Sequence, residues 1–129
     1  MSQLTSAMTD AIMAAARAHA AAIGSPMTIV VTDAGGVLAA LHRMDGAKPA
    51  CSDVAHAKAR SSALFQMPTS GMAGLLATNP GLVSIPNMLF AGGGVPIMVG
   101  GECLGAVGAS GGSEEADEAV ARAGIAAIA

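Results

Sequence analysis

Arg43, Asp45 and Lys58 are the charged residues whose types and spacing best fit a chemical role. Arg43 and Asp45 follow a predicted strand, and Lys58 lies on the helix predicted after the intervening loop. Lys58 is seven residues before Phe65, so its stem lies at the edge of the helix's apolar face, where a partly buried ammonium can serve as an acid, a base or an anchor for a carboxylate. The alternative is an ion-pair network of the three residues that only orders the loop, since structural networks also bring charges together.

The three histidines of the sequence are the candidate ligands for a metal ion or a haem iron. His19 falls on the same helical stripe as Ile12 and Ile23, which directs its imidazole toward the interior or a subunit contact. An axial haem ligand and a satisfied core histidine both fit this position. His42 and His56 belong to no H-x-H or H-x-x-x-H pair, so the sequence predicts no metal site built from closely spaced ligands.

Glycine runs provide a second way to contact a ligand, through backbone N–H groups. Gly93 and Gly94 come directly before a predicted strand, where glycines let N–H groups approach a ligand's oxygen atoms closely. Their spacing matches neither a dinucleotide-binding fingerprint nor a P-loop. They are candidate residues of a pocket rim, and simple turn residues are the alternative.

The two cysteines lie far apart and outside any C-x-x-C pattern, so the sequence predicts free thiols rather than a disulfide or a structural zinc site. Cys51 lies at the predicted start of the helix that carries Lys58, and a helix N-terminus favours the reactive thiolate. Cys51 is therefore a candidate reactive residue, whereas Cys103 lies in a predicted strand and is expected to pack there.

The composition favours a protein that associates with copies of itself. Hydrophobic residues make up 53% of the 129-residue chain and charged residues only 12%, which leaves too little polarity to cover a single small globule. Residues 61–101 contain no charged side chain. Such a stretch usually lies in a core, a pocket wall or a subunit contact, so the sequence predicts a homo-oligomer.

The same composition argues against nucleic acid and membranes as partners. The formal net charge is −3 and the chain has no Trp or Tyr, so it offers neither a basic phosphate-binding surface nor a base-stacking platform. Prolines and a glycine run interrupt the apolar stretches before they reach the about 20 residues that a membrane-spanning helix needs. The N-terminal segment lacks the basic-then-apolar layout of a secretory signal, so we expect a cytoplasmic protein.

The elements that must position these residues follow an α+β order. Helical spacing, β-branched runs and turn residues predict helices over residues 4–23, 52–66 and 69–78, a final helix capped by Ser113, and strands over 27–31, 37–42, 89–90, 95–99 and 103–109. The turns between paired strands are too short for parallel crossovers. We therefore expect one α+β domain over residues 1–129, with an antiparallel sheet packed against helices.

Several motifs spread over the whole chain resemble the GlcG/HbpS-like family, which includes the C-terminal domain of PduO-type proteins. They are VTDAGG at 31–36, RMDGA at 43–47, KAR at 58–60, FQMPT at 65–69, GGVPI at 93–97 and GAVGASGG at 105–112. The resemblance implies a profilin-like antiparallel sheet flanked by helices, in homo-oligomers that bury an apolar face. It also implies that some relatives bind haem or are linked to its degradation, while others have cobalamin-related partners or lie beside glycolate and aromatic catabolism genes.

Three functions are compatible with these features. The first is a small-ligand-binding protein whose subunits frame a pocket for haem, another tetrapyrrole or a small organic acid, with ligand contacts from His19, Arg43, Lys58, Gly93 and Gly94. The second is a cofactor-independent isomerase or lyase of small organic acid or aromatic catabolism, with Lys58, Asp45 and Arg43 as catalytic residues. The third is a structural or partner-docking module. The sequence favours the binding protein.

Overall fold

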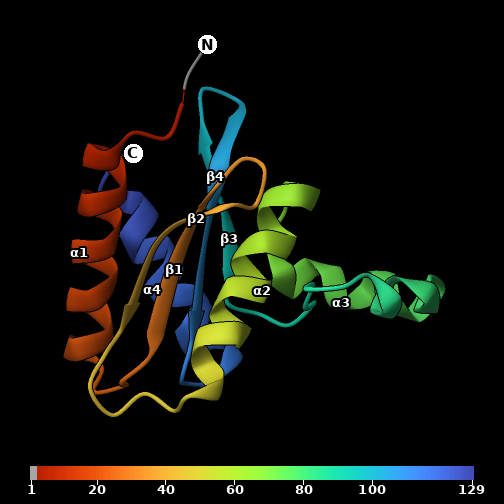
Figure 1. Ribbon diagram of the computed structural model, residues 1–129, viewed down its shortest axis with the longest axis horizontal. Helices are drawn as coiled ribbons and strands as arrows, with labels where there is room; N and C mark the ends of the chain where they lie inside the picture. The colour runs from red at the N-terminus through yellow and green to blue at the C-terminus, as the bar shows by residue number, and fades with distance from the viewer. Residues whose placement is uncertain (1–2) are drawn as a thin grey trace.

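An antiparallel β-sheet of four strands forms the centre of the protein in the computed structural model, which describes residues 3–129 (Figure 1). The strands are β1 (Thr28–Asp33), β2 (Leu38–Arg43), β3 (Gly94–Val99) and β4 (Glu102–Ser110). They lie in the order β2-β1-β4-β3, and each neighbouring pair runs antiparallel. This arrangement confirms the predicted α+β fold class.

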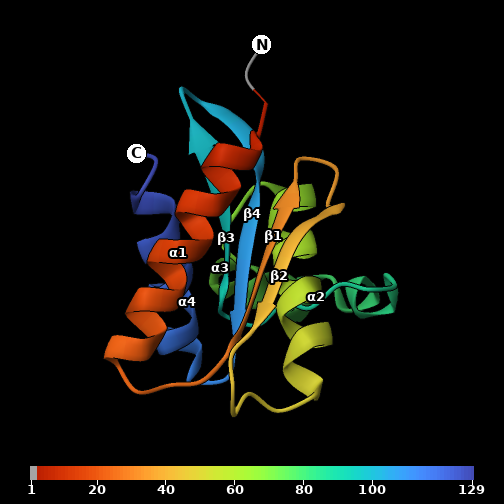
Figure 2. The same cartoon turned by 60° about the vertical axis from the view of Figure 1, so that its left-hand side comes forward.

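Helices cover both faces of the sheet. α1 (Ser6–Ala22) and α4 (Glu114–Ala126) lie side by side on one face, and α2 (Ala50–Phe65) covers the other (Figure 1, Figure 2). Thr5 and Ser113 begin α1 and α4, because each side-chain oxygen accepts a hydrogen bond from a backbone N–H of the first turn. No helix among residues 3–129 is long and apolar enough to cross a membrane.

The main hydrophobic core lies between the sheet and the layer formed by α1 and α4. Ile29 and Val31 of β1 belong to this core, whereas Val30 packs under α2, because alternate strand residues face opposite sides. Gly124 of α4 lets the two helices approach closely, since a Cβ there would lie 2.9 Å from the carbonyl oxygen of Ile12. The position of α1 on the sheet therefore depends on a contact that only a small residue permits.

α2 packs against β4 through small residues. A Cβ on Gly108 would overlap the carbonyl oxygen of Ala55 and lie 2.7 Å from the backbone nitrogen of Ala59. Ala55 and Ala59 are themselves fully buried. This close approach also brings Lys58, the neighbour of Ala59, near the end of the sheet.

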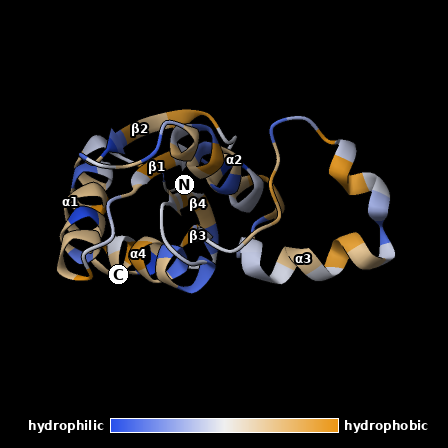
Figure 3. Ribbon diagram, turned by 90° about the horizontal axis from the view of Figure 1, so that it is seen from below, coloured by the Kyte–Doolittle hydropathy of each residue, from blue (hydrophilic) through white to orange (hydrophobic). Residues whose placement is uncertain are grey.

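A short arm projects from the layered body. It consists of α3 (Thr69–Thr78) and the 3₁₀ helix η1 (Pro80–Ser84), and Figure 3 shows it extending away from the sheet and its helices. The buried residues of α3 are Thr69 and Met72, and η1 has none. The side chain of Val83 is 77% exposed. Because the arm falls within the uncharged stretch 61–101, it presents apolar surface without charge.

The strand predicted over residues 89–90 is wrong. The Leu89 N–H donates a 2.8 Å hydrogen bond to the hydroxyl of Ser61, and the ring of Phe90 lies 5.5 Å from the ring of Phe65. Both partners lie on α2, so a helix rather than a neighbouring strand holds this segment.

One helix boundary and one short helix also differ from the sequence prediction. α2 begins at Ala50 instead of following a cap at Ser52, because Pro49 already has helical backbone angles and extends the helix toward the N-terminus. The sequence pattern does not predict η1, whose first residue is Pro80. Proline suits that position because its fixed φ matches the start of a helix.

Candidate functional site

Lys58 is buried in an ion pair with Asp117 of α4. Its ammonium lies 3.0 Å from Asp117 Oδ2 and donates a second hydrogen bond of 3.1 Å to the carbonyl oxygen of Ala109. The side chains of Lys58 and Asp117 are only 5% and 4% exposed. Asp117 also accepts a 2.8 Å hydrogen bond from the N–H of Gly112. Because α2 and α4 cover opposite faces of the sheet, this pair joins the two helical layers at the end of β4.

Gly93 and Gly94 lie directly against this ion pair. A Cβ on Gly93 would lie 2.8 Å from Lys58 Nζ, and a Cβ on Gly94 would overlap the Lys58 carbonyl group. The Gly94 N–H donates a 2.9 Å hydrogen bond to the hydroxyl of Thr69. The structure thus brings Lys58, Gly93 and Gly94 together, but around a tightly packed pair of charges.

Arg43 and Asp45 do not share this cluster. The guanidinium of Arg43 donates through Nε and Nη2 to the carbonyl oxygen of Ala47, at 3.1 and 2.9 Å, and so closes the loop after β2. Asp45 is exposed on the same loop. The alternative of an ion-pair network among Arg43, Asp45 and Lys58 is wrong, because Lys58 pairs with Asp117. These contacts do not assemble the acid–base group that the enzyme hypothesis requires.

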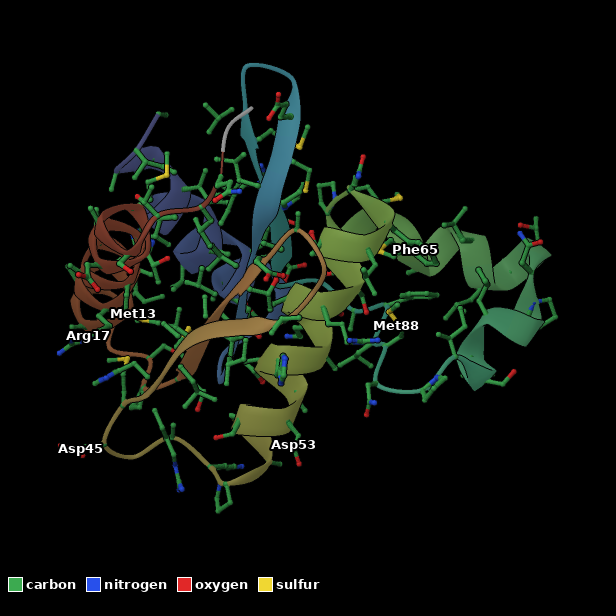
Figure 4. All side chains as sticks on the ribbon, turned by 45° about the horizontal axis from the view of Figure 1, so that its top comes forward. Met13, Arg17, Asp45, Asp53, Phe65 and Met88 are labelled. Carbon is green, nitrogen blue, oxygen red and sulfur yellow. The ribbon has the colours of Figure 1, made fainter. Side chains whose placement is uncertain are left out.

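A groove of about 590 Å³ lies between α1 and the end of β2. Its lining residues are Ala14, Arg17, Ala18, Ala21, His42, Met44 and Asp45. Figure 4 shows Arg17 on α1 and Asp45 on the loop after β2, on the same side of the molecule. The groove therefore offers an imidazole, a guanidinium and a thioether beside a wall of alanines. The sequence alone does not predict this combination, because its residues come from separate elements that only the fold brings together.

His19 lies on the other flank of α1. It follows Ile12 by seven residues and Ala16 by three, and both of these residues contact Gly124, so His19 lies on the side of α1 that faces α4. The residue is half-buried. Within residues 3–129 its imidazole makes no hydrogen bond or ion pair. The alternatives of a ligand and of a packed core histidine both remain for this position.

Both cysteines are free, as predicted. Cys51 lies in the first turn of α2 and is only 9% exposed, which limits access to its thiol. The Sγ of Cys103 lies 3.4 Å from the carbonyl oxygen of Gly105. Among residues 3–129, no group of three or more His, Cys, Asp or Glu side chains is arranged to hold a metal ion.

Glu118 of α4 holds the base of the arm. Its carboxylate accepts a 2.6 Å hydrogen bond from the hydroxyl of Ser70 and a 3.1 Å hydrogen bond from Nε of Arg122. The hydrogen bond from Ser70, together with the hydrogen bond and charge of Arg122, holds the pKa of Glu118 below its ordinary value, although burial acts in the opposite direction. At neutral pH the ionised carboxylate therefore ties α3 to α4.

The structural role of Asp117 is likewise not predictable from the sequence alone. Acidic residues over 114–118 predict only a favourable interaction with the helix dipole. The edge position of Lys58 on an apolar helix face was a usable signal, because a buried ammonium requires a carboxylate partner. Nothing in the spacing selects Asp117 over Glu114 or Glu118 as that partner.

Comparisons with known proteins match nearly the whole chain. The model of a family described as haem degrading protein, HbpS-like, matches residues 4–126. Protein GlcG of Escherichia coli (strain K12) is 36% identical over 108 residues, which cover 83% of this chain and 81% of that protein.

Two solved structures extend the comparison to three dimensions. A double mutant of HbpS from Streptomyces reticuli, 34% identical, has a TM-score of 0.96 over 100% of this chain and 89% of that chain. The structure of a PduOC–haem complex, 27% identical, has a TM-score of 0.93 over 98% of this chain and 96% of that chain. Sheet, helices and arm therefore recur together in these relatives.

Proposed function

This chain belongs to the HbpS-like family, and on that premise we propose that it binds haem, or a closely related tetrapyrrole, beside α1. The observation that carries the proposal is the similarity, over 98% of this chain, to a PduOC domain whose structure was solved as a complex with haem. A small-ligand role of this kind agrees with the binding-protein hypothesis drawn from the sequence.

The residues of α1 fit a bound haem. The porphyrin itself supplies four nitrogen ligands to the iron, so the protein needs to add only one or two axial ligands, and imidazole is a common one. His19 provides an imidazole that is half-buried and has no hydrogen-bond partner within residues 3–129. We propose His19 as the axial ligand. When bound, the haem iron would supply the redox and ligand-binding chemistry, and α1 would hold and orient the macrocycle.

The groove between α1 and β2 supports His42 as a second candidate ligand. His42 and Met44 line it together with Arg17, and a guanidinium can pair with a carboxylate of the kind that haem carries on its propionates. His19 and the groove that contains His42 lie on opposite flanks of α1. A haem bound to one histidine therefore occupies a different surface from a haem bound to the other.

A haem titration followed by the Soret absorption band tests this proposal. We expect a saturable shift with the wild-type protein and with His42→Ala, and its loss with His19→Ala. Loss in His42→Ala alone would place the haem in the groove and overturn the assignment of His19. A change that never saturates with the wild-type protein would overturn haem binding itself. Each histidine variant serves as the control for the other, because both remove one imidazole from the same region.

We further propose that the protein is a homo-oligomer in which the arm contacts a second copy. An arm that carries apolar side chains, such as Val83, and no charge is costly to leave in water. Multi-angle light scattering should give a mass that is a multiple of the 12.4 kDa chain. Val83→Glu should lower that mass, and Ala119→Glu, which adds the same charge at an exposed position of α4, should not. A monomeric wild-type protein would overturn this proposal.

A further inference from the structure

A polar pocket of about 500 Å³ lies on α2, on the face of the sheet opposite α1. Its lining residues are Asp53, His56, Ala57, Arg60 and Asn87. His56 and Ala57 lie three and four positions after Asp53, and Arg60 lies four and three positions after them, so these residues share one face of the helix. Figure 4 shows Asp53 on α2, and Met88, the neighbour of Asn87, on the connection that passes beside this helix.

The charged groups of this pocket have no partners among the residues that the structure describes. Within residues 3–129, the side chains of Asp53, His56 and Arg60 make no hydrogen bond or ion pair. The Nε of Arg60 is buried and lacks an acceptor. Leaving a buried donor unpaired is unfavourable, and for charged groups more so. The Nε–H of Arg60 is therefore available to donate to an acceptor from outside the chain.

The pocket is also held in shape before any ligand arrives. The hydroxyl of Ser61 donates a 2.7 Å hydrogen bond to the Ala57 carbonyl oxygen and accepts one of 2.8 Å from the Leu89 N–H, which fixes the wall that carries Asn87. On the other side, Gly36 leaves room for the Arg60 stem, because a Cβ there would lie 3.1 Å from Arg60 Cγ. A rigid site loses less conformational entropy when it binds.

We propose that this pocket binds a small hydroxycarboxylate. Arg60 pairs with the carboxylate, because the planar guanidinium fork matches a carboxylate better than any other cation does. The amide of Asn87 donates to the same group. Asp53 lies two helical turns before Arg60 and accepts a hydrogen bond from the ligand's hydroxyl at the other end. The site is independent of the proposed haem surface, because α2 and α1 cover opposite faces of the sheet.

Isothermal titration calorimetry with 3-hydroxybutyrate and butyrate tests the proposal, since the two probes differ only by the hydroxyl group. With the wild-type protein we expect saturable binding of both, with 3-hydroxybutyrate the tighter by about fivefold or more, the value of one hydrogen bond. Asp53→Ala should abolish the difference between the probes. Arg60→Met keeps the stem against Gly36 and should weaken both probes by about tenfold or more.

Two further variants keep the test decisive. Lys48→Met removes the same charge from an exposed loop position and should bind as the wild type does. Asn87→Gly removes the amide but suits the positive φ of 60° at this position, so it should fold and weaken both probes. Absence of saturable binding to the wild type, or equal affinities of Arg60→Met and Lys48→Met, would overturn the site. Equal binding of the two probes by the wild type would overturn the role of Asp53.

Discussion

Replacing Lys58 by methionine should lower the free energy of unfolding by about 3–5 kcal/mol, the usual cost of removing one partner of a buried ion pair. Methionine retains most of the stem but neither of the two hydrogen bonds that the ammonium donates, at 3.1 Å to Ala109 and 3.0 Å to Asp117. Asp117 would then be a buried carboxylate whose remaining donor is the Gly112 N–H. Native domains are stable by only about 5–15 kcal/mol, so the variant should be much less stable.

A double-mutant cycle isolates the ion pair from other effects of the substitution. Adding Asp117→Asn to Lys58→Met removes the stranded charge, so the double variant should be less destabilised than the sum of the single variants by about 2 kcal/mol. Urea unfolding is best followed by circular dichroism, since the chain has no Trp or Tyr, and at one fixed protein concentration. If the two single effects were additive, or if Lys58→Met lowered the free energy of unfolding by less than about 1 kcal/mol, the assignment of Lys58 to a stabilising buried ion pair would be refuted.

The other predictions concern packing, pH and the arm. Gly108→Ala should lower the free energy of unfolding by about 3 kcal/mol or more, or prevent folding, because the new Cβ would overlap the Ala55 carbonyl. In Gly74→Ala on α3 the new Cβ meets no atom within 4 Å, so this variant should raise the free energy of unfolding by about 0.5–1 kcal/mol. Urea unfolding measures both changes. The lowered pKa of Glu118 means that its contribution to stability is present above the ordinary Glu value and lost as pH falls through the lowered pKa. Thermal unfolding below about pH 4.5 should therefore show a smaller loss of stability in Glu118→Gln than in the wild type, and equal losses would contradict the tie to Ser70.

Most of the fold could be predicted from the sequence, because short stretches of residues specify most of its helices and strands. The hairpin of β1 and β2 follows from a β-branched run and a second apolar run on either side of a glycine turn. Ser113 caps α4 through the N-terminal hydrogen bond that its residue type favours. The strand predicted over residues 89–90 is wrong because a contact distant in sequence determines this segment. Its apolar residues would suit a strand, but the Ser61 hydroxyl and the Phe65 ring hold it against α2, and no local pattern encodes that contact.

The candidate site was harder to predict, because its contacts join residues that are distant in sequence. Lys58 and Asp117 are 59 positions apart, and the choice of Asp117 depends on how α4 crosses the end of the sheet. The glycine run before a strand predicts a close approach of backbone at Gly93 and Gly94, and in the structure both glycines lie against Lys58. The group that lies against these glycines is Lys58 of the protein itself. A glycine run in the sequence does not distinguish close contact with a protein group from close contact with a ligand.

The positions of the cations also restrict where an anionic ligand can bind. Of the six Lys and Arg residues, Lys58 and Arg122 are paired with carboxylates and Arg43 donates to a carbonyl oxygen. Lys48 is exposed on a loop. Within residues 3–129, Arg17 and Arg60 are therefore the unpaired cations that line a groove or pocket, Arg17 beside α1 and Arg60 on α2.

Arg17 consequently provides a test of which flank of α1 holds the haem. Arg17 and His19 are two positions apart on α1, so their side chains point to different sides of the helix, whereas Arg17 and His42 line one groove. If His19 is the axial ligand, Arg17→Met should leave the haem affinity measured by Soret titration unchanged. A loss of about tenfold, the value of a charged hydrogen bond to a propionate, would place the haem in the groove. It would then make His42 the ligand, because one rigid macrocycle cannot contact both flanks of the helix at once.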